Sequence, residues 1–393
     1  MKLSLTLLIT ALLLAPLAAI HAADPSANSD RLPSFSWDRV PRYMHIRKET
    51  AFSPEELRYL ASFPLITFEK GTCGKDSGST EAGTLAAARA VKALNPAAKV
   101  LYYRNVLVHY GGYAANAALK DVPSAFLVGQ GGNDKLVRGV VQAYDLTSSK
   151  VREWWVANAK QVCADPAIDG LFLDGNVKVL EPSYLLGEIG KAKKDGVLNG
   201  YADLVEETRR ALGPDKLMLA NVLRARFPDS GKSRLRAFDG SYIEAFETAV
   251  GNVPVKDYVA KGIAAFQEAA RQGTVIAFTA GLGEESGDAG KANEARTDEI
   301  RTALKKEDAS DRRFQYLLAL FLICAEKHSY FCAHDGYDVK NSALWRRPRP
   351  EFERPLGAPK GPAVRAGYTY TREFEHASVF VDIEQNNARI NWR

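Results

Sequence analysis

Residues 168–176 read IDGLFLDGN, an apolar run that ends in an aspartate followed by a glycine and an asparagine. A short apolar run of this kind is typical of a strand buried on both faces, as in a parallel sheet. A carboxylate inside such a strand would be costly to bury. Asp174 is therefore expected at the end of the strand, where the chain leaves the sheet.

Seven further apolar runs rich in Val, Ile, Phe and Tyr accompany this one. The eight candidate strands are residues 42–48, 65–71, 99–106, 170–176, 216–222, 241–247, 274–281 and 329–337. Helix-like segments separate most of them, at residues 53–63, 80–94, 148–162, 201–212, 255–272 and 310–326. In the first helix Ser53 and Glu56 have the spacing of a capping box.

The alternation of strands and helices predicts an α/β protein whose parallel strands are joined by crossovers. Eight such units over roughly 300 residues favour a (β/α)8 TIM barrel over an open doubly wound sheet, which more often has five or six strands. The first strand is also not followed by the G-x-G-x-x-G turn of a dinucleotide fold. The sequence therefore predicts a barrel.

Both ends of the chain differ from this alternating region in residue composition and pattern. Residues 1–23 combine Lys2 with a leucine-rich stretch and small residues, which predicts a signal peptide and an exported protein, periplasmic or extracellular. The barrel is expected over residues 36–340. Residues 341–393 begin rich in Pro and Arg and then alternate, which predicts a linker followed by a β-hairpin or small sheet.

Composition excludes some classes of function. The 393 residues are 46% hydrophobic and 25% charged, as in a globular protein, and the formal net charge of +5 is a small surplus that indicates no nucleic-acid partner. After signal cleavage no membrane association is expected, and the oligomeric state stays open. The four cysteines show no C-x-x-C spacing, so they are buried thiols or one or two disulfides of unknown pairing. They are Cys73, Cys163, Cys324 and Cys332.

Polar side chains recur where the candidate strands end. They are Glu69, Arg104, Asn105, Asp174, Asn176, Asn221, Glu244, His334 and Asp335. In this barrel class the active site is built from the carboxyl ends of the strands, so all nine are expected at one mouth. Any single one of them could instead cap a helix or pair with a nearby charge. Arg104 is harder to explain in that way, because an arginine inside an apolar strand needs an acidic partner or an anionic ligand.

Asp174 and Glu244 end the fourth and sixth strands, so their side chains can face each other across the mouth. Paired carboxylates are what glycoside cleavage requires, with one protonating the leaving oxygen and the other attacking or activating water. Asp174 precedes a polar turn and is expected to be the nucleophile or base. Glu244 has apolar neighbours and is expected to be the general acid, whereas Glu247 falls in the following loop. The other seven strand-end residues are expected to bind substrate, with no cofactor and no metal.

Four segments resemble a known family. They are VREWWVANAKQVCADPAIDGLFLDGN (151–176), LMLANVLRARFPDSG (217–231), SYIEAFE (241–247) and TREFEHASVFVD (371–382). These segments resemble the hypothetical glycoside hydrolase-like family 15, which is distinct from the glucoamylases, and more distantly the polygalactosaminidase-type barrels. The resemblance implies a (β/α)8 glycosidase acting on a polysaccharide or oligosaccharide, in which Asp174 and Glu244 match the catalytic pair.

Two other functions remain open from the sequence. The first is a non-catalytic carbohydrate-binding barrel, in which the same polar mouth holds a glycan without cleaving it. The second is a metal-dependent hydrolase with Asp174, Glu244, His334 and Asp335 as ligands, although the chain has only six histidines and no H-x-H or H-E-x-x-H motif. The sugar, the linkage, the endo or exo mode and the stereochemical outcome are not encoded in any motif.

Overall fold

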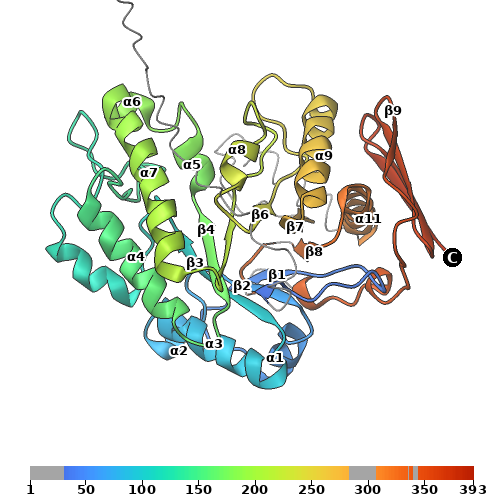
Figure 1. Ribbon diagram of the computed structural model, residues 1–393, viewed down its shortest axis with the longest axis horizontal. Helices are drawn as coiled ribbons and strands as arrows, with labels where there is room; N and C mark the ends of the chain where they lie inside the picture. Colours follow the sequence, from blue (N-terminus) through green and yellow to red (C-terminus); the bar gives the residue numbers. More distant parts are fainter. Residues whose placement is uncertain (1–30, 283–306, 335, 340–343) are drawn as a thin grey trace, which may run out of the picture. The chain divides into compact units, whose positions relative to one another are not determined.

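Eight parallel strands pair in chain order at the centre of the structure (Figure 1). They are β1 (Met44–Ile46), β2 (Leu65–Phe68), β3 (Lys99–Asn105), β4 (Gly170–Asp174), β5 (Leu217–Ala220), β6 (Gly240–Ile243), β7 (Val275–Gly281) and β8 (Ser329–His334). Parallel bridges from Arg42 to Phe331 and from Arg47 to Asp338 close the sheet between β1 and β8. The predicted (β/α)8 barrel is therefore confirmed, with each strand within a few residues of its predicted position.

The computed structural model describes residues 31–282, 307–334, 336–339 and 344–393. The predicted signal peptide, Asp335 and the expected domain limit at residues 340 and 341 lie outside the described residues. Within the described ranges, no helix has both the length and the apolar composition needed to cross a membrane.

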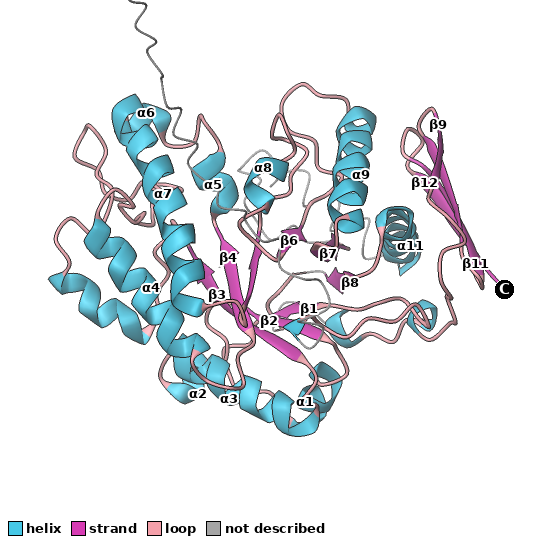
Figure 2. Cartoon of the chain, viewed as in Figure 1, coloured by secondary structure: helices cyan, strands magenta, loops and turns pink. Residues whose placement is uncertain are grey.

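Helices surround the barrel strands (Figure 2). They are α1 (Pro54–Leu60), α2 (Gly74–Ser77), α3 (Thr80–Leu94), α4 (Ser149–Cys163), α5 (Asn176–Leu180), α6 (Leu186–Ile189), α7 (Lys191–Leu212), α8 (Lys232–Leu235), α9 (Val255–Arg271) and α11 (Glu307–Cys324). Short 3-10 turns lie at Ala114–Asp121, Leu344–Arg346 and Pro350–Phe352. The predicted capping box is present at α1, where the Ser53 hydroxyl accepts from the Glu56 amide at 3.2 Å and the Glu56 carboxylate accepts from the Ser53 amide at 2.7 Å.

Helix α7 is longer than predicted, because it begins at Lys191 and not at Tyr201. Gly196 and Gly200 interrupt the helical pattern of the sequence, since glycine weakens a helix. The structure gives the reason for the second glycine: a Cβ atom at Gly200 would lie 1.9 Å from the carbonyl oxygen of Leu146. The close packing of α7 against the chain at Leu146 thus requires glycine at position 200. Glycine is also a residue that lowers the helix propensity of a sequence, so the prediction began the helix too late.

Side-chain alternation along β3 separates two environments. Leu101 and Tyr103 point into the barrel and belong to its interior cluster, whereas Tyr102 packs in the layer between strands and helices. Arg104 also faces outward, and its guanidinium lies 5.2 and 5.5 Å from the ring centres of Trp154 and Trp155. This alternation is the period of two of a strand, and it decides which strand-end residues can reach the mouth.

The chain ends in an antiparallel sheet with the strand order β12-β11-β10-β9. Its strands are β9 (Val364–Ala366), β10 (Thr369–Glu373), β11 (Ala377–Asp382) and β12 (Asn387–Trp392). The predicted hairpin or small sheet is thus four-stranded, and it packs beside α11 (Figure 1). Because this sheet packs on a helix of the barrel, we propose that it forms one folding unit with the barrel.

Arg372 of β10 anchors this sheet to α11. Its buried guanidinium donates to the carbonyl oxygen of Leu322 at 3.1 Å and to that of Ala325 at the carboxyl end of the helix. It also pairs with Glu326 at 3.0 Å. The last carbonyl groups of a helix have no partner within the helix, so this arginine satisfies acceptors that would otherwise be buried without a donor.

Replacing Arg372 by methionine is expected to lower the free energy of unfolding by about 3 to 5 kcal/mol, because it leaves Glu326 and the helix carbonyls without their buried partner. Urea unfolding followed by circular dichroism measures this loss. The control is Arg210→Met, which breaks an exposed pair with Glu206 and should cost less than about 0.5 kcal/mol. Equal effects of the two substitutions would contradict the anchoring role.

Candidate active site

Asp174 is the last residue of β4, and neutral donors hold its carboxylate. The Tyr103 hydroxyl donates to Oδ2 at 2.5 Å, and the Asn105 side-chain amide donates to the same oxygen at 3.1 Å. The Asn105 amide is itself fixed, because its oxygen accepts from the backbone amides of Leu107 and Val108 at 3.0 and 2.6 Å. The carboxylate orientation is therefore set by two residues of the neighbouring strand β3.

Glu244 directly follows β6, and its carboxylate has a polar surround. Arg224 pairs with Oε1 at 2.8 Å, while the hydroxyls of Tyr242 and Tyr337 donate to Oε2 at 3.1 and 3.4 Å. The next residue, Ala245, has φ +47°, a left-handed conformation that residues other than glycine rarely adopt. The apolar neighbours expected to desolvate Glu244 thus do not enclose its carboxylate.

Asn221, which follows β5, connects the two carboxylates. Its side-chain nitrogen lies 3.5 Å from Oδ1 of Asp174 and 3.3 Å from Oε1 of Glu244. Its side-chain oxygen accepts from Nε of Arg224 at 2.7 Å. Since one nitrogen contacts both carboxylate oxygens, these two oxygens are at most about 7 Å apart. Glycoside hydrolases that act with two carboxyl groups hold them about 5 to 9.5 Å apart.

Two buried tyrosines serve as neutral donors in this group. Burial raises the pKa of Tyr103 well above its usual value, and the nearby Asp174 carboxylate raises it further. Burial likewise raises the pKa of Tyr242, with Glu244 adding to the shift. Both hydroxyls are therefore protonated at neutral pH, and each can donate to its carboxylate.

Glu69 lies next to this group at the end of β2 and is buried among basic side chains. Its carboxylate lies 2.8 Å from the Lys70 ammonium and 3.8 Å from both Arg47 and the ring of His45. Burial raises the pKa of Glu69, but Lys70 and His45 outweigh burial and hold it well below its usual range. Glu69 is therefore an ionised structural charge at the mouth.

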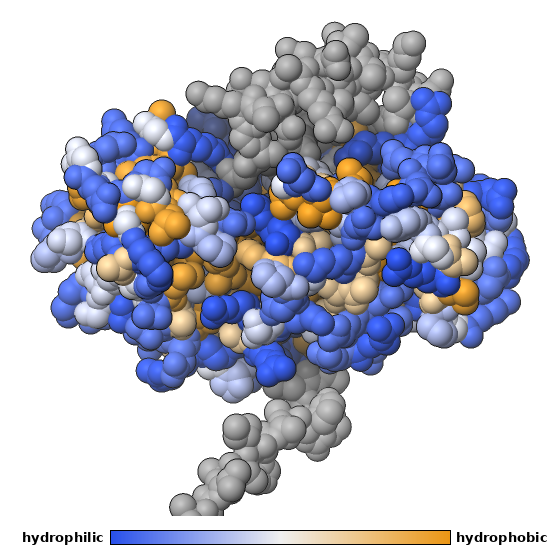
Figure 3. Space-filling model, turned by 90° about the horizontal axis from the view of Figure 1, so that it is seen from above, coloured by the Kyte–Doolittle hydropathy of each residue, from blue (hydrophilic) through white to orange (hydrophobic). Residues whose placement is uncertain are grey.

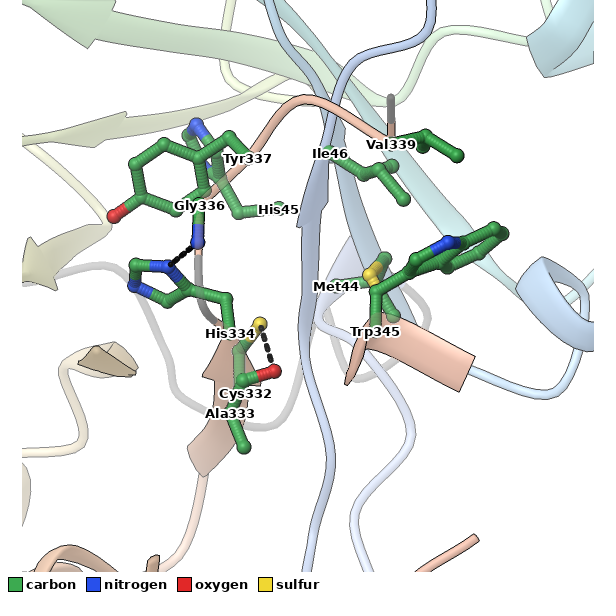
Figure 4. Close-up of a pocket in the computed structure, with 10 residues that line it drawn as sticks. All are labelled: Met44, His45, Ile46, Cys332, Ala333, His334, Gly336, Tyr337, Val339 and Trp345. Atoms are coloured by element: carbon green, nitrogen blue, oxygen red, sulfur yellow. Dashed lines mark hydrogen bonds between the residues drawn. The ribbon is translucent and has the colours of Figure 1, made fainter. Parts of the chain in front are cut away.

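His334 ends β8 and is buried against Tyr337, with ring centres 4.3 Å apart. Its Nδ1 accepts from the backbone amide of Gly336 at 3.2 Å. Figure 4 shows these residues at a small pocket on the seam between β1 and β8, with His45 beside them. Burial, together with His45 and Arg313, lowers the pKa of His334 to about 3, although Glu69 acts in the opposite direction. The imidazole is therefore neutral.

The structure places five of the nine predicted residues in one group at the two carboxylates. Four of them are joined by side-chain hydrogen bonds, and the fifth lies beside them. They are Asn105, Asp174, Asn221 and Glu244, with Glu69 adjacent through Lys70. Asn176 is instead buried between the Leu173 carbonyl and Tyr201 of α7. Arg104 faces the helix layer, and Glu247 pairs with Arg313 of α11 away from Asp174.

Five side chains of this group were not singled out from the sequence as part of the site. They are Lys70, Tyr103, Arg224, Tyr242 and Tyr337. Strand alternation could have found Tyr103 and Tyr242, because each lies two residues before a predicted site residue and so points the same way. Arg224 and Tyr337 lie in loops, for which the sequence carries no comparable signal.

The described residues hold no cluster of three or more His, Cys, Asp or Glu side chains suited to a metal ion. All four cysteines lie in the described part of the chain, where each is a buried thiol outside any disulfide.

The face of the molecule over α5 and α8, seen from above in Figure 3, shows hydrophobic residues toward its middle and hydrophilic residues at its margins.

A comparison with protein families matches residues 92–378 to the model of hypothetical glycosyl hydrolase family 15. The match spans most of the chain and includes both Asp174 and Glu244. The chain belongs to this family. This family membership relates the barrel to glycoside hydrolases. Strands β1 and β2, with Glu69 and Lys70, precede the matched residues. No curated protein matches the chain.

Solved structures with a similar fold include three glycosidases. The glycoside hydrolase domain of PelA from Pseudomonas aeruginosa is 15% identical with a TM-score of 0.42, over 65% of this chain and 89% of that one. The α-galactosidase AgaA from Geobacillus stearothermophilus is 10% identical with a TM-score of 0.48, over 89% and 49%. An Anoxybacillus α-amylase is 11% identical with a TM-score of 0.48, over 88% and 87%.

Replacing His334 by phenylalanine is expected to flatten the dependence of stability on pH. Because folding lowers the pKa of His334 from 6.5 to about 3, the unfolded chain takes up the proton first as pH falls. The stability contributed by the neutral imidazole is complete above pH 6.5 and is lost toward pH 3, at up to ~1.4 kcal/mol per pH unit. Urea unfolding at several pH values measures the slope.

The control is the exposed His376, replaced by phenylalanine in the same way. The His376→Phe variant should keep the wild-type slope between pH 6.5 and 4. A wild-type slope in His334→Phe would show that other groups account for the loss of stability in acid.

Proposed function

We propose that this protein is an exported glycoside hydrolase that cleaves an O-glycosidic bond of a polysaccharide or oligosaccharide with Asp174 and Glu244. The observation that carries the proposal is the Asn221 amide in contact with both carboxylates, because it limits the two contacted oxygens to at most about 7 Å from each other. Retaining and inverting enzymes hold their carboxyl groups about 5 to 9.5 Å apart. Family membership supports the same class of reaction.

We propose Asp174 as the nucleophile or base. Its Oδ2 accepts from a tyrosine hydroxyl and an amide, which stabilise the ionised form that attack on a sugar carbon or activation of water requires. The same donors hold the carboxylate still, so that it approaches the reacting atom from one direction. A substrate would then place its anomeric carbon between Asp174 and Glu244.

We propose Glu244 as the proton donor. Its side chain is 31% exposed, so it can exchange protons with solvent between turnovers. The pair with Arg224 favours the carboxylate that remains after proton donation, so this contact stabilises the product side of the transfer. Because a general acid must start protonated, substrate binding has to weaken this pair, and the activity is expected to be highest at acidic pH.

Exchanging each carboxyl for its amide tests the pair. Asp174→Asn and Glu244→Gln are nearly isosteric and should each lower kcat by about 10²-fold or more while leaving the unfolding midpoint close to that of the wild type. The measurement is the release of reducing ends from a panel of polysaccharides, together with hydrolysis of aryl glycosides. An aryl glycoside with a good leaving group needs little protonation, so Glu244→Gln should retain much of its rate on that substrate and Asp174→Asn should not.

Glu247→Gln is the matched control, because Glu247 lies three residues from Glu244 but pairs with Arg313. Its kcat should stay within a few-fold of the wild-type value. Rescue of Asp174→Asn by the activated substrate would reverse the two roles. Binding of a polysaccharide without release of any product would instead identify a non-catalytic carbohydrate-binding barrel.

A further inference from the structure

Lys70 follows the second barrel strand and has no role in the reaction proposed above. Its side chain is only 20% exposed, and its ammonium lies 2.8 Å from the buried carboxylate of Glu69. Burial lowers the pKa of Lys70, but the Glu69 carboxylate, with a smaller contribution from Asp174, outweighs burial and raises it overall. Lys70 is therefore a permanent positive charge inside the mouth.

The ammonium of Lys70 lies over two tyrosine rings. Its distance to the ring centre of Tyr103 is 5.1 Å and to that of Tyr110 is 4.8 Å. Both values fall within the range of a cation–π contact, in which the ring face attracts the positive charge. Between Glu69 and these rings the ammonium is held in one place and is not a flexible surface charge.

Tyr103 connects this charge to Asp174. Its ring lies below the Lys70 ammonium, and its hydroxyl donates to Oδ2 of Asp174 at 2.5 Å. A cation over a phenol ring draws electron density from it and so makes the hydroxyl a better donor, since neighbouring groups in a buried network polarise one another. Asp174 also contributes to the raised pKa of Lys70, so the two opposite charges stabilise each other.

We infer that Lys70 is a positioning residue that acts on Asp174 through Tyr103 and keeps this carboxylate ionised and oriented for attack. The inference rests on the proposed function of Asp174. A role confined to stability is the alternative, in which Lys70 only neutralises Glu69. The two roles differ in one measurable respect, because only the first makes the acidic limb of the pH–rate profile depend on the charge of Lys70.

The test removes the charge of Lys70 without leaving a buried unpaired carboxylate. Glu69→Gln is compared with the double variant Glu69→Gln/Lys70→Met, which differs from it only at Lys70. Relative to Glu69→Gln, the double variant should lose about 10-fold in kcat with a smaller change in KM. The acidic limb of its kcat/KM profile should move to higher pH by roughly 0.5 to 1 unit, because Asp174 ionises less readily without the cation.

A second pair of variants, Lys70→Arg and Lys70→Met in the otherwise wild-type chain, makes the same comparison if Glu69→Gln fails to fold. Lys70→Arg keeps the charge and should keep the wild-type acidic limb. Lys92→Met is the matched control, because Lys92 also forms a partly buried pair, with Asp169 at 2.8 Å, and its side chain is 17% exposed. This control lies at the amino ends of β3 and β4, so it should leave the pH profile unchanged.

The proposed function is tested separately from this inference. It requires that the wild type has a glycosidase activity and that Asp174→Asn abolishes that activity. If that activity is present and the acidic limb stays in place without the Lys70 charge, the inference about Lys70 is wrong and the proposed function stands. If the wild type cleaves no glycoside, or cleaves it without Asp174, both are wrong. A shifted limb in Lys92→Met as well would mean that any lost cation moves the profile, which would also overturn the inference.

Discussion

The contact of the Asn221 amide with both Asp174 and Glu244 is the interaction on which the mouth of the barrel depends. Two carboxylates held close together repel each other, and a shared donor between them reduces this repulsion. The barrel makes the contact available, because the ends of β4, β5 and β6 lie side by side in the strand order. An asparagine after the middle strand can therefore reach the carboxylates that follow the two outer ones.

The remaining contacts distinguish the two carboxylates from each other. Asp174 receives neutral donors from β3, whereas Glu244 receives a guanidinium from the loop after β5 and hydroxyls from β6 and the segment after β8. Neutral donors orient a charge that stays in place, and a cationic side chain stabilises the charge that appears when a carboxyl group gives up its proton. This difference in partners is what a reaction with two separate carboxyl roles needs.

The fold and the proximity of Asp174 to Glu244 could be predicted from the sequence, because both follow from local pattern. Apolar runs that end in a polar residue locate Asp174 and Glu244 at strand ends, and parallel strands place those ends together. Arg224 could not be predicted, because its position depends on how a loop of irregular backbone packs. Arg104 was predicted at the mouth and lies instead in the helix layer. Neighbouring residues of a strand face opposite sides, so Arg104 and Asn105 could not both point to the mouth.

The outward face of β3 also contributes to the site on its inward face. Arg104 lies among the rings of Trp154, Trp155 and Tyr113, and the indole nitrogen of Trp155 donates to the carbonyl oxygen of Asn105 at 2.9 Å. These contacts hold the backbone at the end of β3, from which the Asn105 side chain reaches Asp174 at 3.1 Å. Arg104, which the sequence indicates as a ligand for substrate, therefore stabilises the mouth from the helix side of the sheet. The strand that carries it must be rigid for Asp174 to keep its orientation.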